Sequence, residues 1–155
     1  MSTELYFLRS SEQKIVTDMF CIAHPNSPQE LEKYTKFYGL TRKDLGLYAL
    51  VDNKIAGAIW SREFTQGGIP KVSVAIVPEF KGEGIGAFMM EQFLQEAGAI
   101  YEEIHIDISL KPKALKFYEK FGFSKIDNTL TLSKKLEKKE VFRPTDGYDP
   151  QKWMD

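Results

Sequence analysis

Three glycines at alternate positions between a strand-like run and a helix-like run constrain the fold more than any other feature. Val72 to Val77 is rich in β-branched residues and stops at Pro78, which cannot donate to a β-ladder. The loop K-G-E-G-I-G follows from Lys81 to Gly86. Apolar residues then recur at three-to-four spacing from Ile85 to Ala97, which predicts a helix packed on a sheet. The segment is therefore a strand, a glycine loop and a helix.

The glycine loop has two interpretations. Glycines leave backbone N–H groups unshielded beside the positive end of a helix, where a pyrophosphate fits. The alternative is a sharp turn with no ligand. The G-x-G-x-G spacing of residues 82–86 differs from the dinucleotide-binding G-x-G-x-x-G, and no Gly-Lys-Ser/Thr of a Walker loop follows it. The common nucleotide-binding loops are thus not matched.

The other apolar runs predict an alternating order of strands and helices, in which Asp52, Asn53 and Lys54 form a hairpin turn. The expected elements are a strand at Leu5 to Leu8, a helix at Glu12 to Ala23, a helical segment after Ser27, strands at Gly46 to Val51, Ile55 to Trp60 and Ile104 to Ile108, a helix from Pro112 to Gly122, and a hairpin of Phe123 to Ile126 with Leu130 to Leu136. This order predicts a single α/β domain over residues 1–136, with a mixed, mostly antiparallel sheet of six to seven strands and helices on both faces.

Residues 137–155 are expected to form a C-terminal extension. Phe142, Tyr148, Trp153 and Met154 make it too apolar for a solvated linker. It is predicted to dock on its own domain or on a second subunit, which would make a homodimer, and a disordered end is the alternative.

Composition excludes several classes of function. The chain has 155 residues, 43% of them apolar and 28% charged, which suits one globular domain. A net charge of -1 from interleaved acids and bases offers no positive field for nucleic acid. No apolar stretch approaches the roughly 20 residues that cross a bilayer, so a cytoplasmic protein without a membrane partner is expected. The single Cys21 lies in the apolar run Ile15 to Ile22 and is interpreted as buried and structural.

The segment from Val72 to Leu94 resembles the acetyl-CoA motif of the GNAT superfamily, which reads V-x-P, then Arg or Gln, two residues, Gly, any residue, and Gly or Ala. Residues 81, 84 and 86 match the second half of this pattern, with Lys81 in place of the usual Arg or Gln, and Val77 and Pro78 precede them as an adjacent pair. The stretch Ala114 to Phe123 resembles the family's A-x-x-x-Y-x-x-x-G-F. Lys111 replaces the Asn common three residues before that Ala, and it either reaches a phosphate or faces solvent.

The resemblance implies acetyl-CoA as co-substrate and no metal. The pantetheine arm would pair like an extra strand with the backbone of Ala75, Ile76 and Val77, and a backbone N–H near Ile76 would polarise the thioester. The residues predicted to contact the co-substrate are Ile76, Val77, Lys81, Gly82, Glu83, Gly84, Ile85, Gly86, Ala87, Lys113 and Phe117.

The implied reaction is direct attack of an amine on the thioester inside an opening between the strands ending at Val77 and Ile108. Tyr118 occupies the family's position for the acid that protonates the departing thiolate. The strand Val72 to Val77 contains no acid, so Glu63 is the first candidate for the base, with Asp107 or an ordered water as alternatives. His105 is interpreted as a packed strand residue.

The acceptor is expected to be a small-molecule or peptide amine. Tyr34, Phe37, Tyr38 and Trp60 either line an aromatic pocket or belong to the core. A non-catalytic acyl-CoA-binding sensor or scaffold is the alternative from another class, and a nucleotide-binding module is a third.

Overall fold

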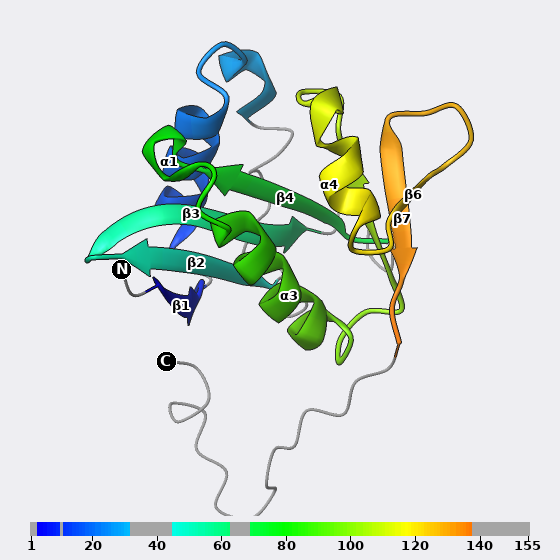
Figure 1. The fold of residues 1–155 in the computed structure, drawn as a ribbon, viewed down its shortest axis with the longest axis horizontal. Coiled ribbons are helices and arrows are strands. Elements are labelled where there is room, and N and C mark those ends of the chain that lie inside the picture. Colours follow the sequence, from blue (N-terminus) through cyan, green and yellow to red (C-terminus); the bar gives the residue numbers. More distant parts are fainter. Residues whose placement is uncertain (1–2, 10, 32–44, 63–68, 138–155) are drawn as a thin grey trace, which may run out of the picture.

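One mixed β-sheet organises the chain (Figure 1). The computed structural model describes residues 3–9, 11–31, 45–62 and 69–137. Within them, seven strands have the order β1-β2-β3-β4-β5-β7-β6, and β4 with β5 is the parallel pair. The strands are β1 (Thr3–Phe7), β2 (Gly46–Val51), β3 (Lys54–Arg62), β4 (Lys71–Ile76), β5 (Glu103–Asp107), β6 (Ser124–Lys125) and β7 (Thr131–Lys135). The predicted fold class is confirmed.

The central meander β2-β3-β4 is joined by a tight turn at its first corner. Asp52 and Asn53 have φ of 51° and 66°, the left-handed conformations of a type I′ turn, whose twist matches that of the strands it joins. Lys54, predicted as part of the turn, already pairs with Val51 as the first residue of β3. The hairpin was therefore predictable to within one residue.

Helices cover both faces of the sheet (Figure 1). Helix α1 (Gln13–Ala23) lies on one face, and α3 (Ile85–Ala97) lies on the other with α4 (Leu115–Glu119). The α1 face buries Val16, Met19, Phe20, Ala58, Trp60 and Ala75. The opposite core includes Leu47, Ile59, Met89, Met90, Phe93 and Ile104. Each face of the sheet thus has its own apolar core.

Strands β4 and β5 share little of their length. Their register contains two pairs, Lys71 with His105 and Val72 with Ile106. Beyond Val72, β4 continues to Ile76 beside β3, while β5 ends at Asp107 and pairs with β7. The two strands diverge at the level of Ser73, where the family resemblance implies an opening between the strands ending at Val77 and Ile108.

The predicted helix after Pro112 is split. Residues Pro112–Ala114 form a 3-10 turn, and α4 begins at Leu115. Gly122 follows with φ of 92°, a conformation that glycine adopts without strain. Two further 3-10 turns lie at Pro28–Glu30 and Pro78–Phe80. The segment that carries Tyr34, Phe37 and Tyr38 lies outside the described residues.

The interpretation of Cys21 as a buried residue is wrong. Cys21 is exposed, and the neighbouring Ile22 is 41% exposed. Helix α1 directs Val16, Met19 and Phe20 toward the sheet. Successive residues of a helix differ by about 100° in direction, so the next two residues after Phe20 point away from that face. Cys21 and Ile22 lie off the buried stripe although the sequence there is continuously apolar.

Candidate functional site

The glycine loop connects β4 to the start of α3. Val77 leads into the 3-10 turn Pro78–Phe80, and Gly82 has φ of 84°. Gly84 is the N-cap of α3 with φ of 79° and makes no side-chain cap. The first N–H groups of a helix have no intrahelical partner, and they coincide with the positive end of the helix dipole. The loop therefore presents unshielded backbone donors to an anion.

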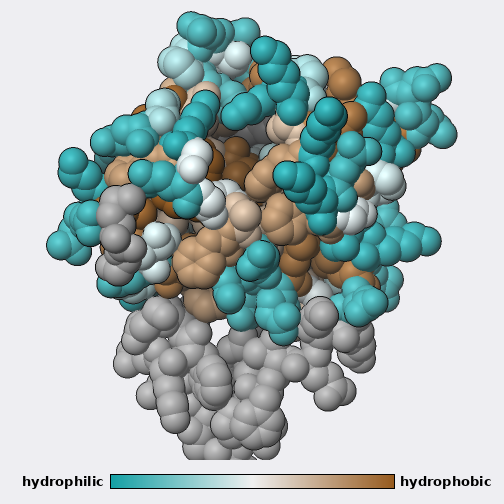
Figure 2. Space-filling model, viewed as in Figure 1, coloured by the Kyte–Doolittle hydropathy of each residue, from teal (hydrophilic) through white to brown (hydrophobic). Residues whose placement is uncertain are grey.

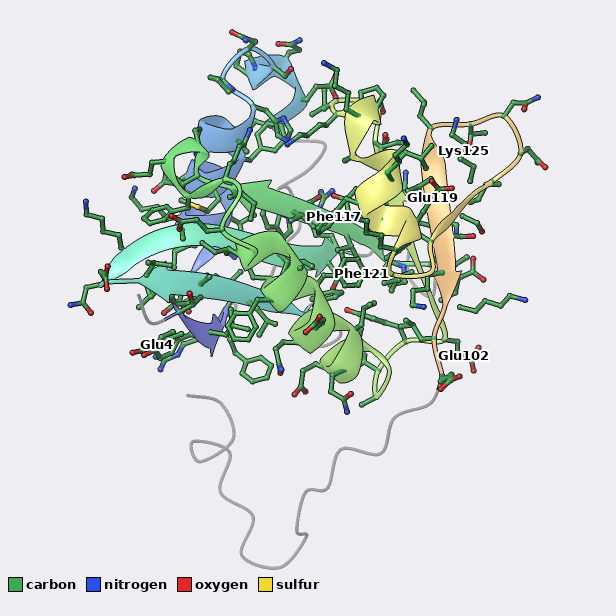
Figure 3. All side chains as sticks on the ribbon, in the orientation of Figure 1. Glu4, Glu102, Phe117, Glu119, Phe121 and Lys125 are labelled. Carbon is green, nitrogen blue, oxygen red and sulfur yellow. The ribbon has the colours of Figure 1, made fainter. Side chains whose placement is uncertain are left out.

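Gly86 lies in the first turn of α3, next to α4. A Cβ at this position would lie 3.4 Å from the Phe117 ring and 3.8 Å from the Ile76 side chain. Phe117 and Phe121 have ring centroids 5.2 Å apart, and Phe117 lies on the side of α4 that faces α3 (Figure 3). These are ordinary van der Waals distances, so α4 packs directly on the first turn of α3 and an alanine at position 86 would also fit.

A hollow of about 460 Å³, here called the large hollow, opens between these elements. Small-molecule sites span roughly 300–1,000 Å³, so its size suits a ligand. Figure 2 shows the surface recessed between α1 and α4, with hydrophobic residues inside and hydrophilic residues around the rim. Its lining includes most of the predicted contact residues: Ile76, Lys81, Gly82, Gly84, Ile85, Gly86, Ala87, Lys113 and Phe117. Val77 and Glu83 are not among its lining residues.

The pairing of β4 with β3 determines which backbone groups face the large hollow. The Val77 N–H donates to the Ala56 carbonyl at 2.8 Å, and Ala75 pairs with Ala58 in the same register. Hydrogen-bonded pairs alternate along an antiparallel ladder, so Val74 and Ile76 direct their N–H and C=O groups away from β3. Of the three residues expected to pair with an extended ligand, Ile76 faces the hollow. The Val77 N–H is already used by β3.

Cationic side chains gather at the large hollow. Lys81, Lys111 and Lys113 all line it. Burial, followed by the charge of nearby Lys81, lowers the pKa of Lys111. Two ammonium groups held this close favour an anionic partner, because each destabilises the other's charge until a counter-charge binds. Lys111, for which the sequence left two interpretations, thus lies beside Lys81 at the hollow.

A second, small hollow of about 50 Å³ lies where β4 and β5 diverge. Its lining includes Phe20, Trp60, Ser73, Asp107 and Tyr118. The Ser73 Oγ is buried without a hydrogen bond among the described residues. A buried hydroxyl normally has a partner, so a water or a ligand group is expected at this position.

Tyr118 belongs to both hollows. The residue is 8% exposed, and burial raises the pKa of its phenol well above the ordinary value. Its ring packs edge-on against Phe117 at 5.2 Å and against Phe123 at 5.9 Å. Its hydroxyl makes no hydrogen bond to any described residue, so a protonated donor is available at the junction of the hollows.

The other predicted groups lie in different surroundings. Glu63 lies outside the described residues. Asp107 lines the small hollow, but its carboxylate accepts the Ser109 N–H at 2.8 Å and also the Ser109 hydroxyl. His105 pairs with Glu103 at 2.7 Å and lines neither hollow. Asp107 therefore helps to form a turn at the end of β5, and His105 is a paired strand residue.

Sequence reasoning missed two residues of the site. His24 follows α1 and lines both hollows, and Ser73 lines the small one. Neither stands in a motif. A polar residue inside the otherwise apolar run of β4 was the one available signal for Ser73, whereas His24 reaches the site through the packing of α1 on the sheet.

Two general features of the described part of the chain complete the description. No group of three His, Cys, Asp or Glu residues there could hold a metal ion. None of its helices is both long and apolar enough to span a membrane.

Comparisons with known proteins concern the family and the fold of the chain. The family model described as acetyltransferase (GNAT) domain matches residues 12–133. No curated protein sequence matches the chain significantly. The fold is similar to a GNAT superfamily phosphinothricin acetyltransferase from Sinorhizobium meliloti in complex with AcCoA, at TM-score 0.65 and 17% identity over 97% of both chains.

Two further solved structures have the same fold. The chain is similar to GCN5 from Tetrahymena, at TM-score 0.66 and 15% identity over 90% of this chain and 99% of that one. It is also similar to mutant forms of the spermidine/spermine N-acetyltransferase from Vibrio cholerae, at TM-score 0.59 and 15% identity over 86% and 95% of the two chains. Because the family model covers most of the sequence, the chain belongs to the GNAT acetyltransferase superfamily.

Proposed function

We propose that this protein transfers the acetyl group of acetyl-CoA to a primary amine by direct attack, without a covalent enzyme intermediate. One observation carries the proposal: the large hollow beside the glycine loop meets the small hollow between β4 and β5 at Tyr118. A thioester at this junction would be accessible to a ligand from each side. Two adjacent sites that share lining residues and differ in size suit a large donor and a small acceptor.

The residues of the large hollow fit acetyl-CoA. The pyrophosphate would accept hydrogen bonds from the N–H groups at the start of α3, with Lys81, Lys111 and Lys113 supplying positive charge. The pantetheine arm would lie along the edge of β4, where Val74 and Ile76 direct their backbone groups. The Ile76 N–H would then polarise the thioester carbonyl, as a donor in an oxyanion hole does.

Tyr118 would supply the proton for the leaving thiolate. The raised pKa of its phenol keeps the hydroxyl protonated at neutral pH. A thiolate becomes a strong proton acceptor as the C–S bond breaks, and no described residue holds the hydroxyl in another hydrogen bond. Val77, Glu83 and Glu63 remain predicted site residues, the last as a base.

Release of free CoA tests the proposal. Acetyl-CoA is incubated with the protein and a panel of small amines, aminoglycosides and peptides, and hydrolysis without an amine is subtracted. Amine-dependent CoA release and a mass gain of one acetyl group on the amine support transfer. Tight acetyl-CoA binding without CoA release in the presence of any amine would instead support a non-catalytic sensor or scaffold. This alternative is kept because β4 contains no acidic residue that could serve as a base.

A thermal-shift comparison tests the ligand itself. Acetyl-CoA at about 100 times its dissociation constant should stabilise the fold by about 2.7 kcal/mol. ATP or NAD at the same concentration should stabilise it less, because the glycine loop lacks the spacing of either nucleotide motif.

A further inference from the structure

The junction of the two hollows contains an acid but also needs a base. Five residues line both hollows: His24, Val74, Lys111, Ala114 and Tyr118. At neutral pH a primary amine is largely protonated to an ammonium ion, so it must lose a proton before its nitrogen can attack. Tyr118 holds its own proton, and Lys111 lies beside Lys81 at the large hollow, where its side chain is assigned to the phosphate of the co-substrate. An imidazole is the remaining side chain at the junction that exchanges protons near neutrality.

We propose that His24 accepts the proton of the acceptor ammonium in the transfer reaction. The inference rests on the proposed function and names a residue for its first step. It competes with Glu63, the base predicted from the sequence.

The backbone holds His24 at the end of α1 independently of its ring. Its N–H donates to the Phe20 carbonyl at 2.9 Å, a bond that any non-proline residue would keep. The ring packs on Phe20 with centroids 5.1 Å apart, and Phe20 itself lines the small hollow. Packing thus places the half-buried imidazole, which makes no hydrogen bond to the part of the chain that the structure describes.

The charges around His24 favour its neutral, proton-accepting form. Burial lowers the pKa of His24 most, and the ammonium groups of Lys111 and Lys81 lower it further. Asp107 lines the same small hollow, where Ser109 occupies its carboxylate, and Tyr118 is uncharged. The imidazole is therefore unprotonated at pH 7. Activity that depends on it should be present above its pKa and be lost as the pH falls through that value.

Co-substrate binding should strengthen this base. The lysines that lower the pKa of His24 are those that line the large hollow beside the glycine loop. A bound pyrophosphate would compensate their charge, and the pKa of His24 should rise toward its ordinary value of 6.5. The residue would then hold a proton best when acetyl-CoA is present.

The protons balance over one turnover. His24 takes one proton from the ammonium, and the neutral nitrogen bonds to the thioester carbon. The C–S bond breaks, and the sulfur takes the Tyr118 proton. The nitrogen loses its second proton to Tyr118, which is restored, and His24 releases its proton to solvent. The products are the acetamide, free CoA and one proton.

The test compares two histidine variants in the full-length protein. The chain has two histidines, and His105 lines neither hollow, so His105→Gln is the matched control for His24→Gln. At pH 7, with the best amine from the panel, kcat/KM for that amine should fall about 10²-fold in His24→Gln, and His105→Gln should retain it within about twofold. The loss should shrink as the pH approaches the pKa of the amine, which then arrives unprotonated. The KM for acetyl-CoA should not change.

The outcomes separate the inference from the function it rests on. No turnover by the wild type overturns both. If the wild type turns over and the pH profile of His24→Gln is unchanged, the inference alone is overturned. A loss of kcat/KM in Glu63→Gln but not in His24→Gln overturns it as well.

If His24→Gln does not fold, a titration of the wild-type protein tests the same inference. Nuclear magnetic resonance of the two imidazoles, assigned with His105→Gln, should give a His24 pKa that rises when acetyl-CoA binds and matches the acidic limb of kcat. A His24 pKa that does not move with acetyl-CoA, or does not match that limb, also contradicts the proposal.

Discussion

Replacing Tyr118 with Phe removes one hydroxyl from the junction of the hollows and leaves the ring in place. The ring contacts with Phe117 and Phe123 involve carbon atoms, and the hydroxyl has no hydrogen-bond partner among the described residues. The free energy of unfolding should therefore change by less than about 1 kcal/mol, since no intramolecular hydrogen bond is lost. Loss of a positioned proton donor should lower kcat by about 10²-fold, which is about 2.7 kcal/mol of the activation barrier.

A second tyrosine provides the opposite control. Tyr101 is 7% exposed, its hydroxyl lies 2.7 Å from the Ser61 hydroxyl, and it lines neither hollow. Tyr101→Phe should cost about 0.5–1.5 kcal/mol of stability through the lost hydrogen bond and leave kcat unchanged. The two variants thus separate a chemical role of the hydroxyl from a structural one.

The assay must measure CoA by chromatography, because Cys21 is exposed and would consume a thiol reagent. Burial raises the pKa of Tyr118, so its phenol stays protonated between pH 6 and 9 and the loss in Tyr118→Phe should be constant over that range. A rate insensitive to solvent viscosity establishes that chemistry limits kcat. Under that condition, a wild-type kcat in Tyr118→Phe would refute the assignment, and so would a loss that disappears at high pH.

Three further predictions concern the ligand and the chain's end. Gly84→Val should weaken acetyl-CoA binding at least tenfold, because valine is strained by about 1–2 kcal/mol at a φ of 79°. Gly84→Asn is the control, because asparagine tolerates this conformation. Equal calorimetric affinities of Gly84→Val and the wild type would contradict the prediction. Lys111→Gln should weaken acetyl-CoA binding about tenfold and reduce the salt dependence of that binding. Lys116 is exposed on α4 and lies outside the hollows, so Lys116→Gln should change neither. Identical salt dependence in Lys111→Gln and the wild type would refute the phosphate role of Lys111. Truncation after Lys139 should lower the melting temperature or the oligomeric mass, and no change in either would show that the tail does not dock.

The parts of the fold that sequence predicted are those fixed by local chemistry. Helix α3 begins at Ile85 and ends at Ala97, where the predicted helix did, because a glycine loop precedes it and its apolar spacing is unambiguous. The Asp52-Asn53 turn was readable because its residue types tolerate positive φ. Cys21 was misassigned because a continuously apolar run does not show which third of a helix is buried.

The parts of the site that sequence did not predict depend on convergence of distant segments. Tyr118 could be proposed from a motif, whereas His24 stands in none and reaches the same junction because Val16, Met19 and Phe20 anchor α1 to the sheet. Lys111 could be assigned to solvent or phosphate from sequence, and its proximity to Lys81 became apparent only in the folded chain.

The divergence of β4 and β5 connects the architecture to the chemistry. After Val72, no strand of the described residues lies beside the outer edge of β4, although Val74 and Ile76 still direct backbone N–H and C=O groups there. A strand edge of this kind is a template for another extended chain. An amide-containing arm of a ligand would complete the ladder, and its far end would arrive beside Tyr118, where the hollows meet. Under the proposed function, the two-residue register of β4 with β5 would both open the site and set the position at which a bound thioester is attacked.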